Sequence, residues 1–218
     1  MKDEILNSFC KVADEFVGNS NSLHKLGTSS KKLENAAGKQ ILDVLNIDNK
    51  EIIYTSGRVE ANNLLVFGIF DKYKLKKHVI LDKNCDDSIK LMLNNYDVDI
   101  DYIDDYNDID KLIRDNTVLI SLCYFSDIDN VLKVIDKYDV LVHVDISNNY
   151  NYFLYNLCDF ITIEDDDLLG FGCLIKNKNI IIEPLFHGGK STTVYRSGTP
   201  ALPFIVAFSK LIKLKYKK

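Results

Sequence analysis

The sequence contains few of the residues that interrupt regular structure, with three prolines and ten glycines among 218 residues. A hydrophobic fraction of 46% and a charged fraction of 27% are ordinary for a soluble globular protein and leave little room for a disordered linker. A chain of this length can bury a large apolar core. We therefore expect a single domain over residues 1–218.

Metal-binding and disulfide patterns are also missing. The five cysteines form no CxxC pair and have no regular spacing with histidine; they are Cys10, Cys85, Cys123, Cys158 and Cys173. This arrangement argues against a zinc site and against a disulfide framework. We expect reduced thiols and no bound metal.

Signals for membranes and nucleic acids are weak as well. No positively charged segment followed by an apolar stretch opens the sequence, and no apolar run approaches the ~20 residues that cross a bilayer. The net charge is −5 and the basic residues are interspersed with acids, so no basic stripe could neutralise a phosphate backbone. We therefore expect a cytoplasmic protein with neither a membrane nor a nucleic acid as partner.

The pattern of apolar residues predicts helices that alternate with strands. The predicted helices lie near 2–16, 30–45, 59–70, 87–94, 108–114, 128–137 and 203–214. The predicted strands lie near 51–55, 78–81, 97–103, 117–122, 140–145, 160–163, 173–176 and 180–182. This alternation favours a three-layer α/β/α fold around a mainly parallel sheet. The last strands follow one another closely, which indicates antiparallel neighbours at one edge.

Several short motifs are more specific than the composition. Thr-Ser-Gly-Arg-Val occupies 55–59, where a strand turns into a helix, and a helix N-terminus favours an anion. His-Val-Asp-Ile-Ser-Asn occupies 143–148 at a strand end, and His-Gly-Gly at 187–189 precedes Arg-Ser-Gly-Thr at 196–199. In this order, from about residue 5 to about residue 210, the motifs resemble those of cysteine desulfurases, pyridoxal-phosphate enzymes of the class V aminotransferase family.

The resemblance implies the large, cofactor-binding domain of fold type I pyridoxal-phosphate enzymes. It also implies that Ser56 and Gly57 face the cofactor phosphate and that Asp145 pairs with the pyridine nitrogen. Arg58 and Val59 stand where the family usually has alanine and threonine. The positions that match cofactor-binding residues are Ser56, Gly57, Arg58, Val59, Asp86, Asp145, Asn148, Glu164, Asp166 and Thr199.

The chemical groups of the family are missing from their positions. Asp167 stands at the lysine that forms the Schiff base, Asp166 at a histidine and Glu164 at a serine. Asp86 replaces the histidine that stacks on the ring. The family's first strand, and its small C-terminal domain with the persulfide cysteine, have no counterpart in residues 1–218. We therefore expect no catalytic residue and no cofactor, or pyridoxal phosphate if any.

Three functional interpretations follow. The first is a catalytically inactive homologue kept for binding or structure, which forms a homodimer or pairs with an intact cysteine desulfurase. The product of a decaying gene, with little function of its own, is the alternative to this interpretation. The second is a pyridoxal-phosphate enzyme in which Lys190 or Lys176 replaces the missing lysine. The third is a noncovalent binder of pyridoxal phosphate that uses Ser56, Gly57 and Asp145.

Overall fold

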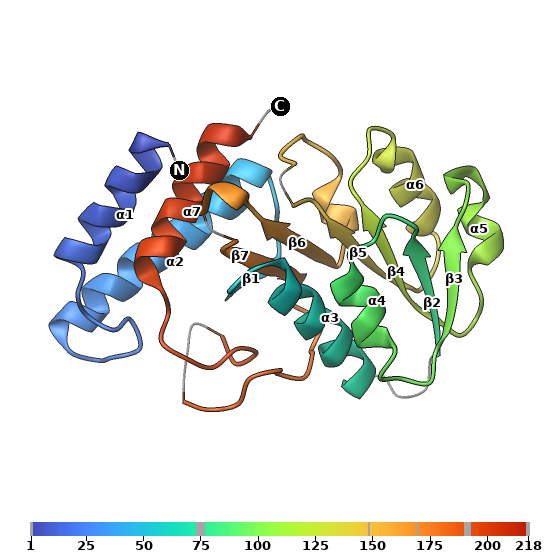
Figure 1. The fold of residues 1–218 in the computed structure, drawn as a ribbon, viewed down its shortest axis with the longest axis horizontal. Coiled ribbons are helices and arrows are strands. Elements are labelled where there is room, and N and C mark those ends of the chain that lie inside the picture. The colour runs from blue at the N-terminus through green and yellow to red at the C-terminus, as the bar shows by residue number, and fades with distance from the viewer. Residues whose placement is uncertain (1, 73–76, 148, 169, 190–192, 217–218) are drawn as a thin grey trace.

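A computed structural model describes residues 2–72, 77–147, 149–168, 170–189 and 193–216. Within these ranges, seven strands form one sheet in the order β1-β7-β6-β5-β4-β2-β3 (Figure 1). The strands are β1 (Lys50–Thr55), β2 (His78–Asp82), β3 (Asp99–Ile103), β4 (Thr117–Cys123), β5 (Leu141–Asp145), β6 (Phe160–Glu164) and β7 (Gly172–Asn177). Strands β6, β5, β4, β2 and β3 are parallel, whereas β7 is antiparallel to both β6 and β1.

Helices cover both faces of the sheet. The α-helices are α1 (Asp3–Glu15), α2 (Lys25–Leu45), α3 (Arg58–Lys72), α4 (Asp87–Leu93), α5 (Ile109–Leu112), α6 (Ile128–Ile135) and α7 (Leu202–Lys215). The short 3-10 turns are η1 (Tyr106–Asp108), η2 (Tyr155–Leu157) and η3 (Asp166–Leu168). Helices α3 and α4 pack on one face, in front of the sheet in Figure 1, and the other α-helices pack on the opposite face. The predicted three-layer α/β/α fold is therefore confirmed.

The two cores follow from the alternation of side chains along buried strands. On β2, Ile80 belongs to the core beneath α1, α2, α5, α6 and α7, while Val79 and Leu81 belong to the core beneath α3 and α4. Both faces of each central strand are thus apolar, as expected for a covered parallel sheet. In the described residues, no helix has the length and apolarity to span a membrane.

Most predicted elements form within a few residues of their expected positions. The main shift is α2, which begins at Lys25 because the His24 side chain caps it, accepting a hydrogen bond from Gly27 N at 3.1 Å. The antiparallel pairing of the late strands is also present, between β6 and β7.

The strand predicted at 180–182 is absent from the sheet. This segment instead crosses α3, where Glu183 N donates to Gly68 O at 3.1 Å. Ile182 packs against the same glycine so closely that a Cβ at position 68 would lie 2.8 Å from the Ile182 Cβ. The apolar run that predicted a strand therefore serves to bury the surface of α3.

Lys176 on β7 is fully buried near the end of the sheet opposite the carboxyl ends of the parallel strands. Its Nζ lies 2.7 Å from Glu51 Oε1 and donates to Asn177 O at 3.0 Å and Ile180 O at 2.6 Å. The ammonium also lies 4.5 Å from the centre of the Tyr195 ring. These contacts hold the segment after β7 against the sheet, and the Lys176 amine is fully occupied by them.

Replacing Lys176 with methionine should destabilise the fold by about 3 kcal/mol, because it leaves Glu51 and two carbonyl oxygens without their donor. Urea denaturation followed by circular dichroism measures this change. The same substitution at exposed Lys178 is the matched control and should stay within about 0.5 kcal/mol of the wild type. Equal stability of the two variants would contradict a structural role for the buried amine.

Candidate functional site

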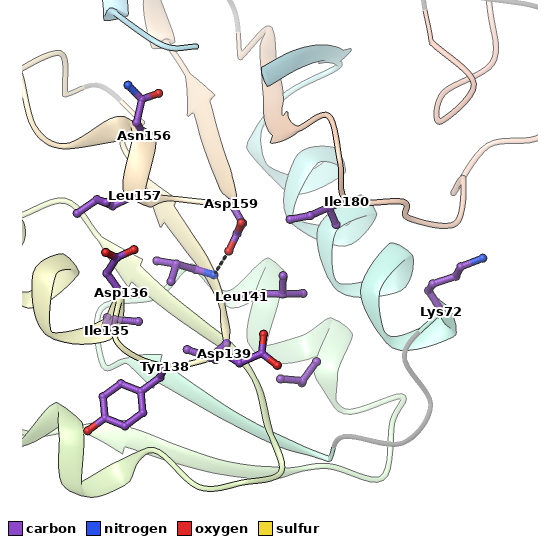
Figure 2. Close-up of a pocket in the computed structure, with 13 residues that line it drawn as sticks. Lys72, Ile135, Asp136, Tyr138, Asp139, Leu141, Asn156, Leu157, Asp159 and Ile180 are labelled. Atoms are coloured by element: carbon purple, nitrogen blue, oxygen red, sulfur yellow. Dashed lines mark hydrogen bonds between the residues drawn. The ribbon is translucent and has the colours of Figure 1, made fainter. Parts of the chain in front are cut away.

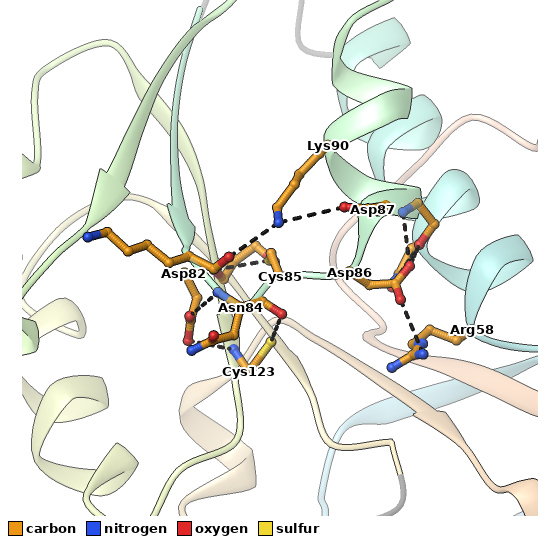
Figure 3. Close-up of polar contacts among 12 residues, drawn as sticks. Arg58, Asp82, Asn84, Cys85, Asp86, Asp87, Lys90 and Cys123 are labelled. Atoms are coloured by element: carbon orange, nitrogen blue, oxygen red, sulfur yellow. Dashed lines mark hydrogen bonds and ion pairs between the residues drawn. The ribbon is translucent and has the colours of Figure 1, made fainter.

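The candidate site lies at the carboxyl ends of the parallel strands, where ligands bind in open α/β sheets. Strand β4 ends at Cys123, β5 at Asp145 and β6 at Glu164, and α3 begins beside them at Arg58. A cavity of about 220 Å³ opens here, lined by Arg58, Asn84, Asp86, Cys123, Tyr124, Asp145, Ser147 and Asn149. Figure 3 shows part of this wall, with the Arg58 guanidinium turned toward Asp86.

Asp145 is the buried acceptor of the cavity, with an exposed fraction of 5%. Its Oδ1 accepts a hydrogen bond from Ser147 N at 2.9 Å, whereas its Oδ2 has no hydrogen-bond partner among the described residues. Burial raises the pKa of this carboxyl group, although Ser147, Arg58 and Asn62 act in the opposite direction. An unpaired buried oxygen is costly, so Asp145 is suited to receive a donor from a ligand.

Arg58 and Asp86 form an ion pair at the mouth of the cavity, with Nη2 and Oδ2 3.2 Å apart. Asp86 is also the N-cap of α4, because its Oδ1 accepts a hydrogen bond from Ser88 N at 2.9 Å. Burial acts to raise the pKa of Asp86, but the hydrogen bonds from Ser88 and the Arg58 charge outweigh it and lower the pKa. Asp86 is therefore a carboxylate that holds Arg58 in place.

The N-terminus of α3 is bonded by carboxylates of the chain itself. Arg58 N donates a short hydrogen bond to Glu164 Oε2, and Ser56 N donates to Glu60 Oε2 at 2.8 Å. Gly57 has φ +153°, and a Cβ there would lie 3.0 Å from Glu164 Oε2 and 2.5 Å from Gly170 O. The Glu164 carboxylate thus lies against the turn that the sequence predicts for a phosphate.

These observations test whether pyridoxal phosphate fits the site. The unpaired Oδ2 of Asp145 suits a protonated ring nitrogen. The turn does not suit a phosphate, because a second anion there would meet Glu164 in the same place and at the same N–H group. The residues present therefore fit the ring nitrogen of the cofactor and not its phosphate.

The acidic segment after β6 faces α7. Lys215 on α7 donates to both carboxylate oxygens of Asp165 at 2.8 Å and lies 2.8 Å from Asp167 Oδ2. Tyr150 OH donates to Asp165 Oδ2 at 2.7 Å, and Asp165 is fully buried. Asp166 is exposed in η3, outside the lining of the cavity. The Asp167 carboxylate therefore has a cation as its partner.

Other predicted site residues lie apart from the cavity. Val59 is exposed on α3, and Thr199 lines a separate cavity of about 330 Å³ together with Ser56. Asn148 and Lys190 lie outside the described residues. Lys176, the second candidate for a replacement amine, lies near the opposite end of the sheet and is not in the cavity lining.

Sequence reasoning missed five residues that line the cavity: Asn84, Cys123, Tyr124, Ser147 and Asn149. All five stand at or within a few residues of the ends of β2, β4 and β5. The position of a residue at the end of a predicted parallel strand was therefore the signal that could have found them.

A larger cavity of about 860 Å³ lies at the opposite end of the central strands, where β4 and β5 begin, beside the end of α6 (Figure 2). Its central carboxylate, Asp159, accepts a hydrogen bond from Val142 N at 3.0 Å, and burial raises its pKa. That carboxylate is thus engaged in holding β5, and the lining carries no turn of the kind that the sequence motifs mark. The smaller cavity is the better candidate site.

Comparison with known proteins identifies the family. Residues 2–161 match the model of the aminotransferase class-V family, which is more than half of the chain. The chain belongs to this family. The family assignment made from the sequence motifs is therefore confirmed.

Curated relatives to which this class-V aminotransferase homologue is similar include cysteine desulfurases. The chain is 28% identical over 226 residues to cysteine desulfurase IscS of Buchnera aphidicola subsp. Schizaphis graminum, covering 89% of this chain and 55% of the relative. It is 25% identical over 244 residues to putative cysteine desulfurase IscS 1 of Bacillus subtilis, covering 98% of this chain and 63% of the relative. The chain thus spans less than two thirds of the length of these relatives.

Solved structures share the fold. A NifS-like protein superposes with a TM-score of 0.88 at 21% identity, covering 98% of this chain and 66% of the other. The cysteine desulfurase CsdA of Escherichia coli superposes with a TM-score of 0.74 at 14% identity, covering 98% and 65%. The seven-stranded sheet and its helices are therefore those of the large domain of fold type I pyridoxal-phosphate enzymes.

Replacing Asp145 with asparagine should stabilise the protein at pH 7 by on the order of 1 kcal/mol, because an amide cannot ionise in the buried site. The raised pKa means that the folded state binds the proton more tightly, so the wild type loses stability as pH rises above about 4. Urea denaturation between pH 4 and pH 7 should show a shallower slope for the variant.

Asp86→Asn is the control of opposite sign. The lowered pKa of Asp86 contributes stability above the unfolded pKa of about 4, and that stability is lost as pH falls through the folded value. Asp86→Asn should therefore weaken the fold at pH 7. If both variants change the free energy of unfolding at pH 7 in the same direction, the raised pKa of Asp145 and the lowered pKa of Asp86 cannot both be right.

Proposed function

We propose that this chain is a cysteine desulfurase-like protein without desulfurase activity, retained for binding or structure. The residue that carries the proposal is Asp167, which stands at the position of the family's Schiff-base lysine. Its carboxylate lies 2.8 Å from Lys215 Nζ. A carboxylate cannot form an imine with an aldehyde.

The groups around the cavity support the same conclusion. No lysine is among the described residues that line it, and the two carboxylates in the lining have separate roles. Asp86 holds Arg58, and Asp145 is buried with one oxygen unpaired. Proton transfer at a substrate carbon requires a base within reach, and the family's base is the same missing lysine.

Noncovalent binding of pyridoxal phosphate is disfavoured by Glu164. Its carboxylate accepts the hydrogen bond from Arg58 N that a phosphate would need. Binding of the intact cofactor would require Glu164 to leave the turn or to become protonated, and either change costs binding free energy. Pyridoxal phosphate is therefore not expected as a resident cofactor.

Exposed apolar side chains support a role in protein pairing. Large apolar residues are exposed before and at the start of α2 and in the segment between β7 and α7; they are Val17, Leu23, Leu26, Phe186 and Val194. The two segments meet where Asn19 Nδ2 donates to Thr199 Oγ1 at 3.4 Å. Large apolar side chains that are exposed in a free chain are often covered when proteins associate. A homodimer or a pair with an intact cysteine desulfurase in the cytoplasm would cover them.

The purified protein should release no sulfide from L-cysteine in the presence of pyridoxal phosphate, and borohydride should trap no stoichiometric adduct at one lysine. Peptide mass spectrometry distinguishes such an adduct from scattered labelling of surface lysines. An intact cysteine desulfurase is the positive control, and Lys190→Ala should behave as the wild type does. A single reducible adduct that maps to one lysine would overturn the proposal.

Pairing through the exposed segments predicts a dimer in light scattering coupled to size exclusion. Leu23 is 99% exposed, and Leu23→Asp should shift the protein toward monomer by placing charge in the interface. Leu91→Asp, at a position that is 64% exposed on α4, is the matched control and should leave the dimer intact. A monomeric wild type would refute self-pairing, and equal dissociation of both variants would refute this surface.

A further inference from the structure

Two cysteine side chains meet at the wall of the cavity (Figure 3). Cys123 ends β4, lines the cavity and is half-buried, whereas Cys85 lies in the loop after β2 and is buried. Their thiol groups are within hydrogen-bond reach of each other, and Cys123 Sγ donates to Asn84 O at 3.3 Å. Both cysteines are free in this structure. The fold therefore places a dithiol where the sequence has no CxxC motif.

Asp82, at the end of β2, holds the backbone of both cysteines. Its carbonyl oxygen accepts a hydrogen bond from Cys85 N at 2.9 Å, and its Oδ2 accepts one from Cys123 N at 3.3 Å. Strands β2 and β4 also pair here, with Leu81 beside Ser121. Because both backbones are anchored to one residue, the cysteines stay adjacent while their side chains rotate toward the ~2 Å of an S–S bond.

A chain of hydrogen bonds fixes the group to which Cys85 donates. Thr162 Oγ1 donates to Asn62 Oδ1 at 2.9 Å, so it accepts from His143 Nε2, which is 2.9 Å away. Burial lowers the pKa of His143 to about 3, so its neutral ring accepts at Nδ1 from Ser121 Oγ at 2.8 Å. The Ser121 oxygen therefore accepts from the Cys85 thiol, whose Sγ lies 3.3 Å away. Oxidation of Cys85 would remove this donor.

The other three cysteines lie away from the cavity lining. Cys10 is exposed on α1, whereas Cys158 and Cys173 are buried in the core, where burial raises the pKa of both thiols. Reagents in solution can therefore reach Cys10 and Cys123, and Cys123 is the one that lines the cavity beside a second thiol.

We propose that Cys123 and Cys85 are a redox-active pair that closes a reversible disulfide when a low-molecular-weight disulfide reaches the cavity. The Cys123 thiolate attacks one sulfur of the small disulfide, breaks its S–S bond, releases one small thiolate and leaves a mixed disulfide on Cys123. The Cys85 thiolate then attacks the Cys123 sulfur, forms the protein disulfide and releases the second small thiolate. Each protein thiol loses one proton, and the small disulfide takes up two electrons to become two thiols.

This inference goes beyond the proposed function and is independent of it, since it uses neither an imine nor a partner protein. The neighbouring groups set its rate. The hydrogen bond with Cys85, burial, and the carboxylates of Asp82 and Asp145 raise the pKa of the Cys123 thiol, while the cation of the lining, Arg58, is held by an ion pair. Thiolate is therefore scarce at pH 7 and exchange is slow there. A thiol of raised pKa is also a poor leaving group, so the closed disulfide resists reduction.

The test incubates the full chain with glutathione disulfide at pH 8, alkylates the remaining thiols and maps peptides by mass spectrometry. The wild type should lose two hydrogen atoms and yield a peptide that links Cys85 to Cys123, and dithiothreitol should reverse the change. Cys10→Ser removes the exposed thiol on α1 and is the matched control, with an unchanged yield of the linked peptide. Absence of this peptide in both proteins would overturn the proposal.

Two variants assign the order of attack. Cys85→Ser keeps a donor to Ser121 but lacks the resolving thiol, so its glutathione adduct at Cys123 should be at least about tenfold more abundant than in the wild type. Cys123→Ser should leave the buried Cys85 unmodified. An equal amount of adduct at Cys123 in Cys85→Ser and in the wild type would refute the resolving role. Circular dichroism melting confirms that each variant is folded.

The His143 ring gives a second readout, which does not depend on the chemistry of the adduct. Closing the disulfide removes the thiol donor from Ser121, so the nitrogen chemical shifts of the His143 ring should move on oxidation of the wild type. The same treatment of Cys123→Ser should leave them in place. Unchanged shifts in a wild type that carries the linked peptide would contradict the hydrogen bond from Cys85 to Ser121.

Discussion

The hydrogen bond from Arg58 N to Glu164 ties the end of β6 to the start of α3, and the geometry of the site depends on it. The helix N-terminus attracts an anion, and in this chain the anion is part of the polypeptide. The bond keeps the turn at Gly57 closed against Gly170. It also positions Arg58 to reach Asp86 across the mouth of the cavity.

Much of the fold could be predicted because it depends on local patterns. Alternating apolar runs mark the strands of the sheet, and four motifs in order mark the family. The strand predicted at 180–182 does not form. An apolar run indicates that a segment is buried, but it does not indicate which element packs against it, and Ile182 packs against Gly68 on α3. A close contact between a side chain and a helical glycine leaves no periodic signal.

The site could be predicted only in part. Motif positions indicated Arg58, Asp86, Asp145 and Glu164, and the structure brings these residues to one place. The sequence showed that the segment after β6 is acidic but did not show the cation that pairs with it: Lys215 lies against the carboxylates of Asp165 and Asp167. The partners are about 50 residues apart, and a pairing over that separation has no counterpart in spacing or composition.

The contacts of Lys215 also bear on how this chain could change in evolution. Its ammonium occupies the position beside Asp167 and bonds the buried Asp165. A single substitution of Asp167 by lysine would place two ammonium groups together over one remaining carboxylate, and like charges at such a distance repel. A lysine at position 167 would therefore require a second, compensating change on α7. The ammonium of Lys215 thus favours a carboxylate over an amine at residue 167.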